Sequence, residues 1–404
     1  MKMTKKIFTL CMVLSPLLSL YGVSESSITF MDISLIILIP LMTLVNIKVG
    51  RLRLNNIYFE LLPFLLFIVI QFLLLSIIVY DRGLFINIGL RTFRYCLYLG
   101  TVVFFAKDYF EYEYGIKVLK YFAIFATTYL FAQLILLRGF NFYLKGYLPF
   151  LPVMRESLIT FSESARYTEY TRVRSIFGEI SQYAITVSAY LSCSLFSEHK
   201  LKSPKVKIYL TFGLLLSAST LGILNAFIIW IMWLFILVVR SRDKINPKAI
   251  LIFNLSVFLA LLYYFNSSFY QLFTSRFDSS ASGRFAAYFD YFINNKDMIW
   301  SEVFFGIGMN THVNILSFWY PSIAKIWRFF GVVGSGVFFV SILATFYRFR
   351  KNLSQMGLLA FFLFLGTGTE AVIGNFVLLF FPLILCQKMS KEQIPNKNIL
   401  VEYQ

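Results

Sequence analysis

The chain has 404 residues, of which 58% are hydrophobic and 14% are charged, and its formal net charge is +17. A soluble domain of this length needs far more charged surface, and a β-barrel has short alternating segments in place of long apolar runs. These features exclude both classes and predict an all-α, polytopic membrane protein in which residues 1–404 form a single integral membrane domain.

The basic residues lie in short segments between the apolar runs, which is the pattern of the positive-inside rule. We therefore expect contact with membrane lipid and no binding of nucleic acid. Each of the four cysteines lies inside an apolar run, far in sequence from the others, so neither a disulfide nor a metal site is expected. The sequence has no phosphate-binding glycine loop, and we expect no cofactor.

One membrane crossing needs about 20 apolar residues, and on this measure the sequence predicts about twelve spans. In chain order they are 7–23, 28–47, 57–80, 88–106, 118–137, 181–196, two within 208–239, 249–265, 326–347 and two within 354–387. The paired stretches break at 217–222 and 366–370, where small and polar residues interrupt the apolar run. The first span follows a basic start without a convincing cleavage site, so we expect an uncleaved helix.

The lysines predict which side of the membrane each end faces. Lys2, Lys5 and Lys6 place the amino terminus in the cytoplasm. The lysine-rich segments between later spans then fall on the same side, as does the polar tail at 388–404, which we expect to be disordered. The segment from Lys107 to Lys120 is expected to be one of these cytoplasmic loops.

Two long segments fall on the outer side of this arrangement. The first large loop is 138–180, with a short interfacial helix expected near Phe150, and the second is 266–324. Shorter outer turns are expected at 24–27 and 81–87.

Three charged residues lie within or between apolar runs near the predicted outer face. Arg91 and Arg94 are one helical turn apart and share a face, where they either reach toward the outer surface or bind phosphate. Glu370 lies between the last two spans, where it is either a turn residue or a functional carboxylate.

The outer loops carry mostly arginine, whereas the cytoplasmic segments carry mostly lysine. A guanidinium group binds phosphate oxygens in a bidentate way and keeps its charge at any accessible pH. Arg155 and Arg166 have acidic neighbours and are expected to form ion pairs. For Arg172, Arg174 and Arg284 we favour binding of an anionic, lipid-linked substrate.

Residues 172–181 read RVRSIFGEIS and resemble the signature of the O-antigen polymerase (Wzy) and O-antigen ligase superfamily. Arg172 falls on the arginine of that signature, Phe177 on its aromatic position and Glu179 on its acidic or amide position. Ile180 stands where the family usually has proline. The signature ends the first large outer loop in that family, which is its position in this chain.

The second loop carries weaker elements in the order of the same family. The segment ASGR that ends at Arg284 resembles its S-x-R element, and residues 305–308 resemble its G-x-G turn. His312 and Asn314 resemble its H-N element with one residue inserted, and residues 331–334 resemble the G-h-h-G start of the next helix. The resemblance covers roughly residues 170 to 340.

This resemblance implies a GT-C-like, inverting, metal-independent glycosyltransferase of the bacterial inner membrane, with cytoplasmic termini and two large periplasmic loops. It would polymerise oligosaccharide repeat units in the biosynthesis of lipopolysaccharide or a related surface polysaccharide. Donor and acceptor would both be glycans linked to undecaprenyl diphosphate, and a chain-length regulator protein is an implied partner.

The chemistry of such a reaction assigns roles to the outer charges. Fixed arginines stabilise the negative charge that collects on the leaving diphosphate, and a base activates the acceptor hydroxyl. The expected diphosphate-binding residues are Arg172 and Arg284, supported by Arg174 and Arg276. The candidate bases are Glu179 and His312.

Two other functions remain open at this point. One is the O-antigen ligase of the same superfamily, which transfers the finished chain to the lipid A core. The other is a flippase for lipid-linked oligosaccharides, which is a transporter and also has about twelve helices. Flippases usually have short loops and charges spread through their spans, so the two long outer loops favour an enzyme.

Overall fold

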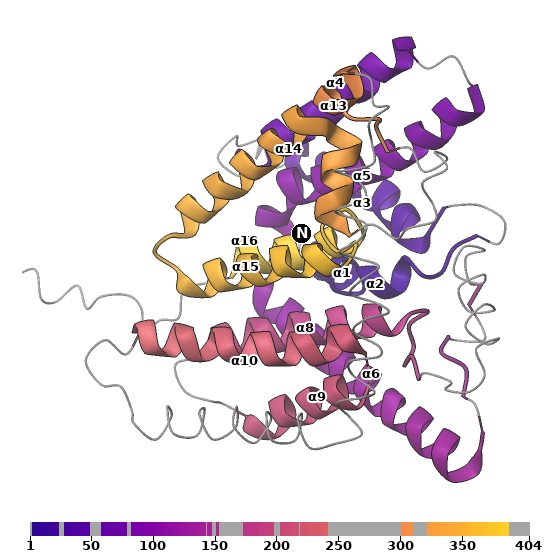
Figure 1. Cartoon of the computed structure of the whole chain (residues 1–404), viewed down its shortest axis with the longest axis vertical. Helices are drawn as coiled ribbons and strands as arrows, with labels where there is room; N and C mark the ends of the chain where they lie inside the picture. The colour runs from indigo at the N-terminus through magenta and orange to yellow at the C-terminus, as the bar shows by residue number, and fades with distance from the viewer. Residues whose placement is uncertain are drawn as a thin grey trace, which may run out of the picture.

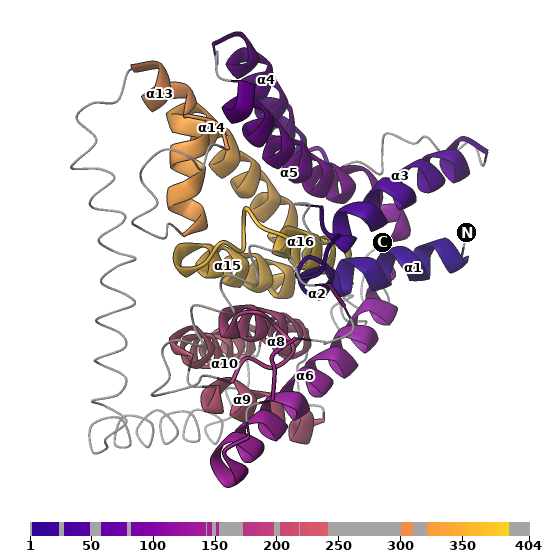
Figure 2. The same ribbon diagram turned by 90° about the vertical axis from the view of Figure 1, so that its right-hand side faces the viewer.

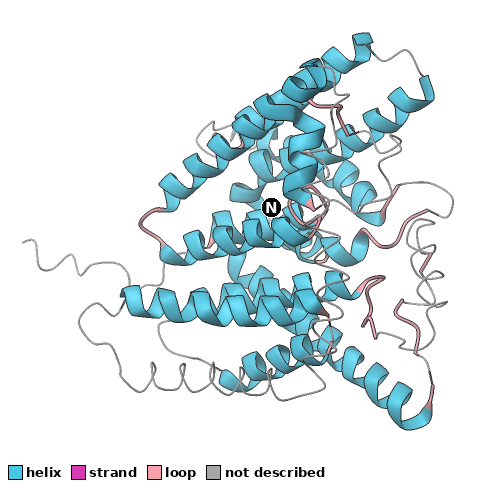
Figure 3. Ribbon diagram, viewed as in Figure 1, coloured by secondary structure: helices cyan, strands magenta, loops and turns pink. Residues whose placement is uncertain are grey.

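The computed structural model describes residues 2–23, 28–48, 58–78, 82–142, 144–147, 151–152, 173–197, 203–217, 219–240, 300–309 and 321–387. These residues are mostly helical (Figure 3). Their only β-type pairing is one isolated antiparallel bridge between Gly22 and Thr29. The predicted all-α class is therefore confirmed for the described part of the chain.

The amino-terminal half contains α1 (Lys2–Val13), α2 (Ser15–Leu18), α3 (Phe30–Lys48), α4 (Leu62–Ile78), α5 (Arg82–Tyr109) and α6 (Tyr112–Phe140). The predicted span 7–23 is divided, because α1 ends at Val13 and α2 starts afresh with Pro16 in its first turn. The predicted outer turn 81–87 is helical from Arg82 on, and most of the predicted 107–120 loop is helical, which corrects both predictions. Neither segment contains a proline that would end a helix.

The carboxy-terminal half contains α8 (Ile180–Phe196), α9 (Pro204–Leu216), α10 (Thr220–Arg240), α13 (Trp300–Phe305), α14 (Ser322–Phe349), α15 (Leu353–Gly368) and α16 (Phe376–Cys386). Both predicted breaks are confirmed, since α9 and α10 form a pair, as do α15 and α16. The predicted span 249–265 and the tail 388–404 lie outside the described residues.

Four described helices are long and apolar enough to cross a membrane, namely α3, α6, α10 and α14. Shorter apolar helices include α4, α15 and α16. The 11 residues of α16 cover roughly 16 Å, about half of a hydrocarbon core of about 30 Å. These helices are those of a membrane-embedded protein, while the count of about twelve spans stays a prediction.

Large apolar side chains cover the outward faces of several helices. On α4, Leu73 and Ile77 are exposed, and on α14 so are Val340 and Leu343. A soluble protein rarely exposes apolar patches of this kind, whereas lipid tails accommodate them.

The core forms around two helices that are buried on nearly all sides, α8 and α16. Helix α16 packs against α5, and α8 lies beside α10 and α6 (Figures 1 and 2). Stacking of Phe362 on Phe380, with ring centroids 4.8 Å apart, joins α15 to α16. The four cysteines are free thiols, and Cys193 on α8 is fully buried.

Candidate functional site: a cationic pocket at the start of three helices

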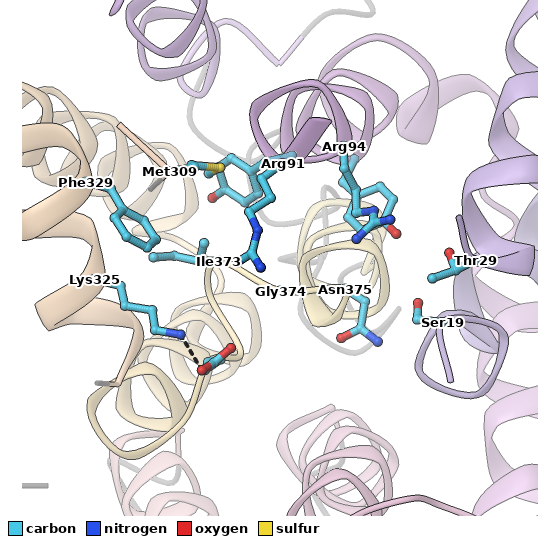
Figure 4. A pocket seen from close by; sticks show the side chains of 13 residues that line it. Ser19, Thr29, Arg91, Arg94, Met309, Lys325, Phe329, Ile373, Gly374 and Asn375 are labelled. Atoms are coloured by element: carbon cyan, nitrogen blue, oxygen red, sulfur yellow. Dashed lines mark hydrogen bonds and ion pairs between the residues drawn. The ribbon is translucent and has the colours of Figure 1, made fainter. Parts of the chain in front are cut away.

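A cavity of about 320 Å³ lies between α5, the start of α14 and the turn that joins α15 to α16 (Figure 4). Its walls are formed by Ser19, Thr29, Arg91, Arg94, Tyr95, Tyr98, Met309, Lys325, Phe329, Glu370, Ile373, Gly374 and Asn375. Three of these side chains are cations and one is a carboxylate. The cavity is therefore a polar, mainly positive site within a largely apolar protein.

Arg94 is held by a carboxylate behind the cavity wall. Its Nη2 lies 3.0 Å from Oδ2 of Asp32, and its Nε donates to both carboxylate oxygens. The hydroxyl of Tyr98 donates to Oδ1 of Asp32 at 2.8 Å. Arg94 is thus fixed in position and largely neutralised.

The start of α3 explains where Asp32 points. The backbone N–H of Thr29 donates to Oδ2 of Asp32 at 2.9 Å, and the N–H of Asp32 donates to Oγ1 of Thr29 at 3.1 Å. This reciprocal pair satisfies N–H groups that the first turn of a helix leaves without partners. One carboxylate therefore both caps α3 and positions Arg94.

Arg91 differs from Arg94 in having no hydrogen bond or ion pair with another described residue. Its side chain is exposed and extends into the space between Lys325 and Asn375 (Figure 4). All five N–H donors of its guanidinium are available for a ligand in this cavity. The expectation that Arg91 and Arg94 share a face is confirmed, because both line the cavity.

The opposite wall holds an ion pair between Lys325 and Glu370, marked by the dashed line in Figure 4. The backbone around this pair is fixed by Ser322, the first residue of α14. Its N–H and its hydroxyl both donate to the carbonyl of Thr369 at 2.8 Å, and the N–H of Val372 donates to its Oγ at 3.0 Å. Glu370 is therefore a turn residue that also forms part of the cavity.

Three helices begin at this cavity. Thr29 immediately precedes α3, Lys325 lies in the first turn of α14, and Asn375 immediately precedes α16. The start of a helix carries a partial positive charge and backbone N–H groups without helical partners. Asp32 already caps α3, whereas the starts of α14 and α16 add to the charge of the cations, so the cavity favours an anion.

A glycine turn forms another part of the wall. Gly306 and Gly308 have φ values of 74° and 68°, so the predicted G-x-G turn is confirmed. The N–H of Gly308 donates to the carbonyl of Phe329 at 2.9 Å. This contact places Met309 and Phe329 together at the cavity.

The expected helix start at residues 331–334 needs a correction. Helix α14 begins nine positions earlier, at Ser322, and Gly331 with φ 64° kinks it. The side chain of Gln71 donates to the carbonyls of Phe305 and Phe329 beside this kink. The glycine turn of the predicted second loop and Gly331 of the following helix therefore meet each other, and Gln71 of α4 donates to the carbonyl groups between them.

Only two of the six site residues predicted from the sequence are described. Arg174 is 8% exposed, and its Nη1 donates to the carbonyl of Gly178 at 3.3 Å. Glu179 is exposed at the start of α8 and accepts a hydrogen bond from Ser181 at 2.9 Å. Neither residue lines the cavity. The remaining four, Arg172, Arg276, Arg284 and His312, lie outside the described residues.

The end of the first outer loop is held by a buried side chain, Gln133 of α6. Its Oε1 accepts from the N–H groups of Arg174 and Ser175, at 3.2 and 2.7 Å. Its Nε2 donates to the carbonyls of Leu144 and Ser175, at 3.0 and 3.2 Å. One amide therefore joins both ends of the loop to the same helix.

Sequence analysis missed Lys325, which lines the cavity, and Asp32, which lies behind the cavity wall. The T-x-x-D spacing of Thr29 and Asp32 could have predicted the cap, but nothing local in the sequence links Asp32 to Arg94. Lys325 could have been noticed as a cation at the predicted outer end of a span.

No known protein family and no curated protein matches this chain. The chemistry of the cavity is therefore the main guide to function.

Proposed function

We propose that this protein is a membrane glycosyltransferase that polymerises oligosaccharide repeat units linked to undecaprenyl diphosphate, and that its cationic cavity binds the diphosphate. The observation that carries the proposal is Arg91, a cation with free donors that extends into a cavity already lined by Arg94 and Lys325. A diphosphate presents several oxygen acceptors to such a group.

The predicted membrane orientation supports this location. The cavity is built from Ser19 at the end of the first predicted span, from Arg91 near the start of the fourth, and from the break between the last two. The lysine distribution predicts that each of these ends faces outward. Lipid-linked repeat units are polymerised at that face in the family that the sequence resembles.

The proposed reaction requires charge stabilisation more than covalent help from the protein. A hydroxyl of the acceptor attacks the anomeric carbon of the donor, the bond from that carbon to the diphosphate oxygen breaks, and the hydroxyl proton passes to a base. Negative charge collects on the departing diphosphate, which Arg91 and the nearby helix starts would stabilise. Glu179 and His312 remain the proposed bases.

The loop arginines keep their proposed roles with one refinement. Arg172 and Arg284 are proposed to approach the same diphosphate from the two outer loops, with Arg276 in support. Because the guanidinium of Arg174 donates to the carbonyl of Gly178 within its own loop, we assign Arg174 to holding that loop.

Replacement of Arg91 tests the proposal directly. With purified protein in detergent and lipid-linked repeat units as substrate, Arg91→Ala should lower the polymerisation rate by about 100- to 1,000-fold, because one donor to a developing charge is lost. Arg91→Lys should recover part of the rate, since the charge returns without the planar fork.

The matched control is Arg138→Ala, which removes an exposed arginine near the end of α6, away from the cavity. That variant should polymerise at the parental rate. Full activity of Arg91→Ala would show that the cavity does not bind the diphosphate.

One observation favours the transporter alternative. The cations of the cavity lie on helices α5 and α14, as in a flippase, and not in the two long loops. A flippase would fail to polymerise in detergent but would move a lipid-linked oligosaccharide across reconstituted vesicles. Gene deletion distinguishes the polymerase from the ligase. Cells without a polymerase carry one repeat unit on the lipid A core, whereas cells without a ligase carry none.

A further inference from the structure

The two ion pairs at the cavity differ in how firmly they are held. The side chain of Asp32 is 8% exposed, and it has partners on α3 and α5 as well as the guanidinium of Arg94. The side chains of Lys325 and Glu370 are 21% and 44% exposed. Solvent weakens a partly exposed lysine–carboxylate pair more than a buried one, so the second pair is the one that a ligand can open.

The net charge of the cavity also suggests that the Lys325–Glu370 pair opens when a ligand binds. Arg91, Arg94 and Lys325 supply three positive charges, and Glu370 together with Asp32 behind the wall removes two. A single net positive charge is poorly matched to a diphosphate. Release of Lys325 from Glu370 would provide a second free cation beside Arg91.

We infer that Glu370 is an internal counter-ion, which occupies Lys325 until a multiply charged phosphate ligand displaces it. The inference rests on the proposed function for the identity of that ligand, a polyprenyl diphosphate. On binding, Lys325 exchanges a carboxylate oxygen for a phosphate oxygen, and Glu370 turns toward solvent.

The local structure allows this exchange without a change of fold. Ser322 fixes the turn at Thr369 and Val372 to the first turn of α14 through three hydrogen bonds. The backbones that carry Lys325 and Glu370 therefore stay in place. Only the side chains of Lys325 and Glu370 need to rotate, and the flexible stem of the lysine carries a compact charge that is suited to changing partners.

The carboxylate of Glu370 also stabilises the charge of Lys325 when no ligand is bound. Lys325 lies in the first turn of α14, where the helix dipole disfavours a cation. Glu370 offsets that cost when no ligand is bound. It also keeps singly charged anions from occupying Lys325, because they offer no more charge than the carboxylate that they would replace.

The test measures binding of inorganic pyrophosphate to the purified full-length protein by isothermal titration calorimetry. Glu370→Gln should bind pyrophosphate about 2- to 5-fold more tightly than the parent, which is the range expected when a partly exposed competing ion pair is removed. Equal or weaker binding by Glu370→Gln, in a protein that unfolds at the parental temperature, would overturn the inference.

The matched control is Glu60→Gln. Glu60 pairs with Arg348, which also lies on α14 but at its other end, away from the cavity, with Nη1 and Oε2 2.8 Å apart. This variant also removes one negative charge that pairs with a cation of α14, and it should leave pyrophosphate affinity unchanged.

A second variant keeps the inference falsifiable if Glu370→Gln folds poorly. Lys325→Gln should weaken pyrophosphate binding, because the released lysine contacts the ligand. Parental affinity in Lys325→Gln would mean that Lys325 never leaves Glu370, and would also overturn the inference.

The outcomes separate this inference from the proposed function. If Glu370→Gln binds pyrophosphate more tightly but the parent protein does not polymerise, Glu370 is a counter-ion and the proposed polymerase activity is wrong. If polymerisation depends on Arg91 but Glu370→Gln binds pyrophosphate as the parent does, the protein is a polymerase and the counter-ion role of Glu370 is wrong.

Discussion

Single amide side chains hold the irregular backbone of this protein onto its helices. Gln133 of α6 contacts four backbone groups at the two ends of the first loop, and Gln71 of α4 contacts two carbonyls beside the kink in α14. An amide suits this task because it both donates and accepts hydrogen bonds. Buried backbone groups that lost these partners would pay a desolvation cost.

Replacement of Gln133 by methionine should therefore be costly. The change keeps the size of the side chain but leaves the N–H groups of Arg174 and Ser175 without their acceptor. The free energy of unfolding should fall by about 2 kcal/mol, measured as a lower thermal unfolding temperature in detergent, and limited proteolysis should cut near residue 175. Ile135→Met, which changes a side chain on the same helix that is 63% exposed, is the control and should change neither result.

At the scale of elements, the kink in α14 at Gly331 packs against the glycine turn that contains Gly306, next to the cavity. Gly331 has φ 64°, and a Cβ on it would lie 2.5 Å from the backbone N of Gly306. An ordinary residue is disfavoured there both by its backbone conformation and by the close approach of another chain segment. The kink sets the direction of the first turns of α14, which carry Lys325 and Phe329.

Two glycines of α14 give a matched comparison. Gly331→Ala should destabilise the protein by about 2 kcal/mol or more, because the left-handed conformation and the backbone contact both oppose a side chain. Gly336→Ala, where a Cβ would meet no atom within 4 Å, should be neutral or stabilising by up to about 1 kcal/mol. Thermal unfolding in detergent measures both, and equal stability of the two variants would contradict this account of the kink.

At the scale of the whole molecule, a second cavity lies at the other end of α5 and α16. It is lined by residues that include Tyr58, Lys107 and Cys386. Between the two cavities α5 and α16 are closely packed, with Val102 and Leu378 fully buried. The two ends of this helix pair are therefore separated by a tightly packed apolar layer, and the predicted orientation places them on opposite sides of the membrane.

Labelling in intact cells tests that orientation. A membrane-impermeant maleimide should modify Asn375→Cys in the cationic cavity but should modify Glu113→Cys at the second cavity only after lysis. The parent protein, with its four native cysteines, gives the background. The opposite pattern would invert the orientation and remove the outer-face location from the proposed function. A reporter fused after Asp278 should independently indicate the outer side.

Prediction from sequence worked where the determinants are local. The breaks between α9 and α10 and between α15 and α16 follow from small and polar residues that interrupt apolar runs, and α3 begins at a cap formed by neighbours in sequence. It was less accurate for segments 81–87 and 107–120. There charge suggested loops, but α5 already begins at Arg82 and extends to Tyr109, and α6 begins at Tyr112, since no proline opposes these helices.

The class of the protein, most of its described helices and the shared face of Arg91 and Arg94 can be predicted from the chain alone, because apolar run length and helical spacing are properties of neighbouring residues. Which of the two arginines is neutralised depends on the packing of the helices. Asp32 reaches Arg94 and Glu370 reaches Lys325 across large separations in sequence, while Arg91 is left with free donors. Such pairings depend on how helices pack together, and no local pattern in the chain encodes them.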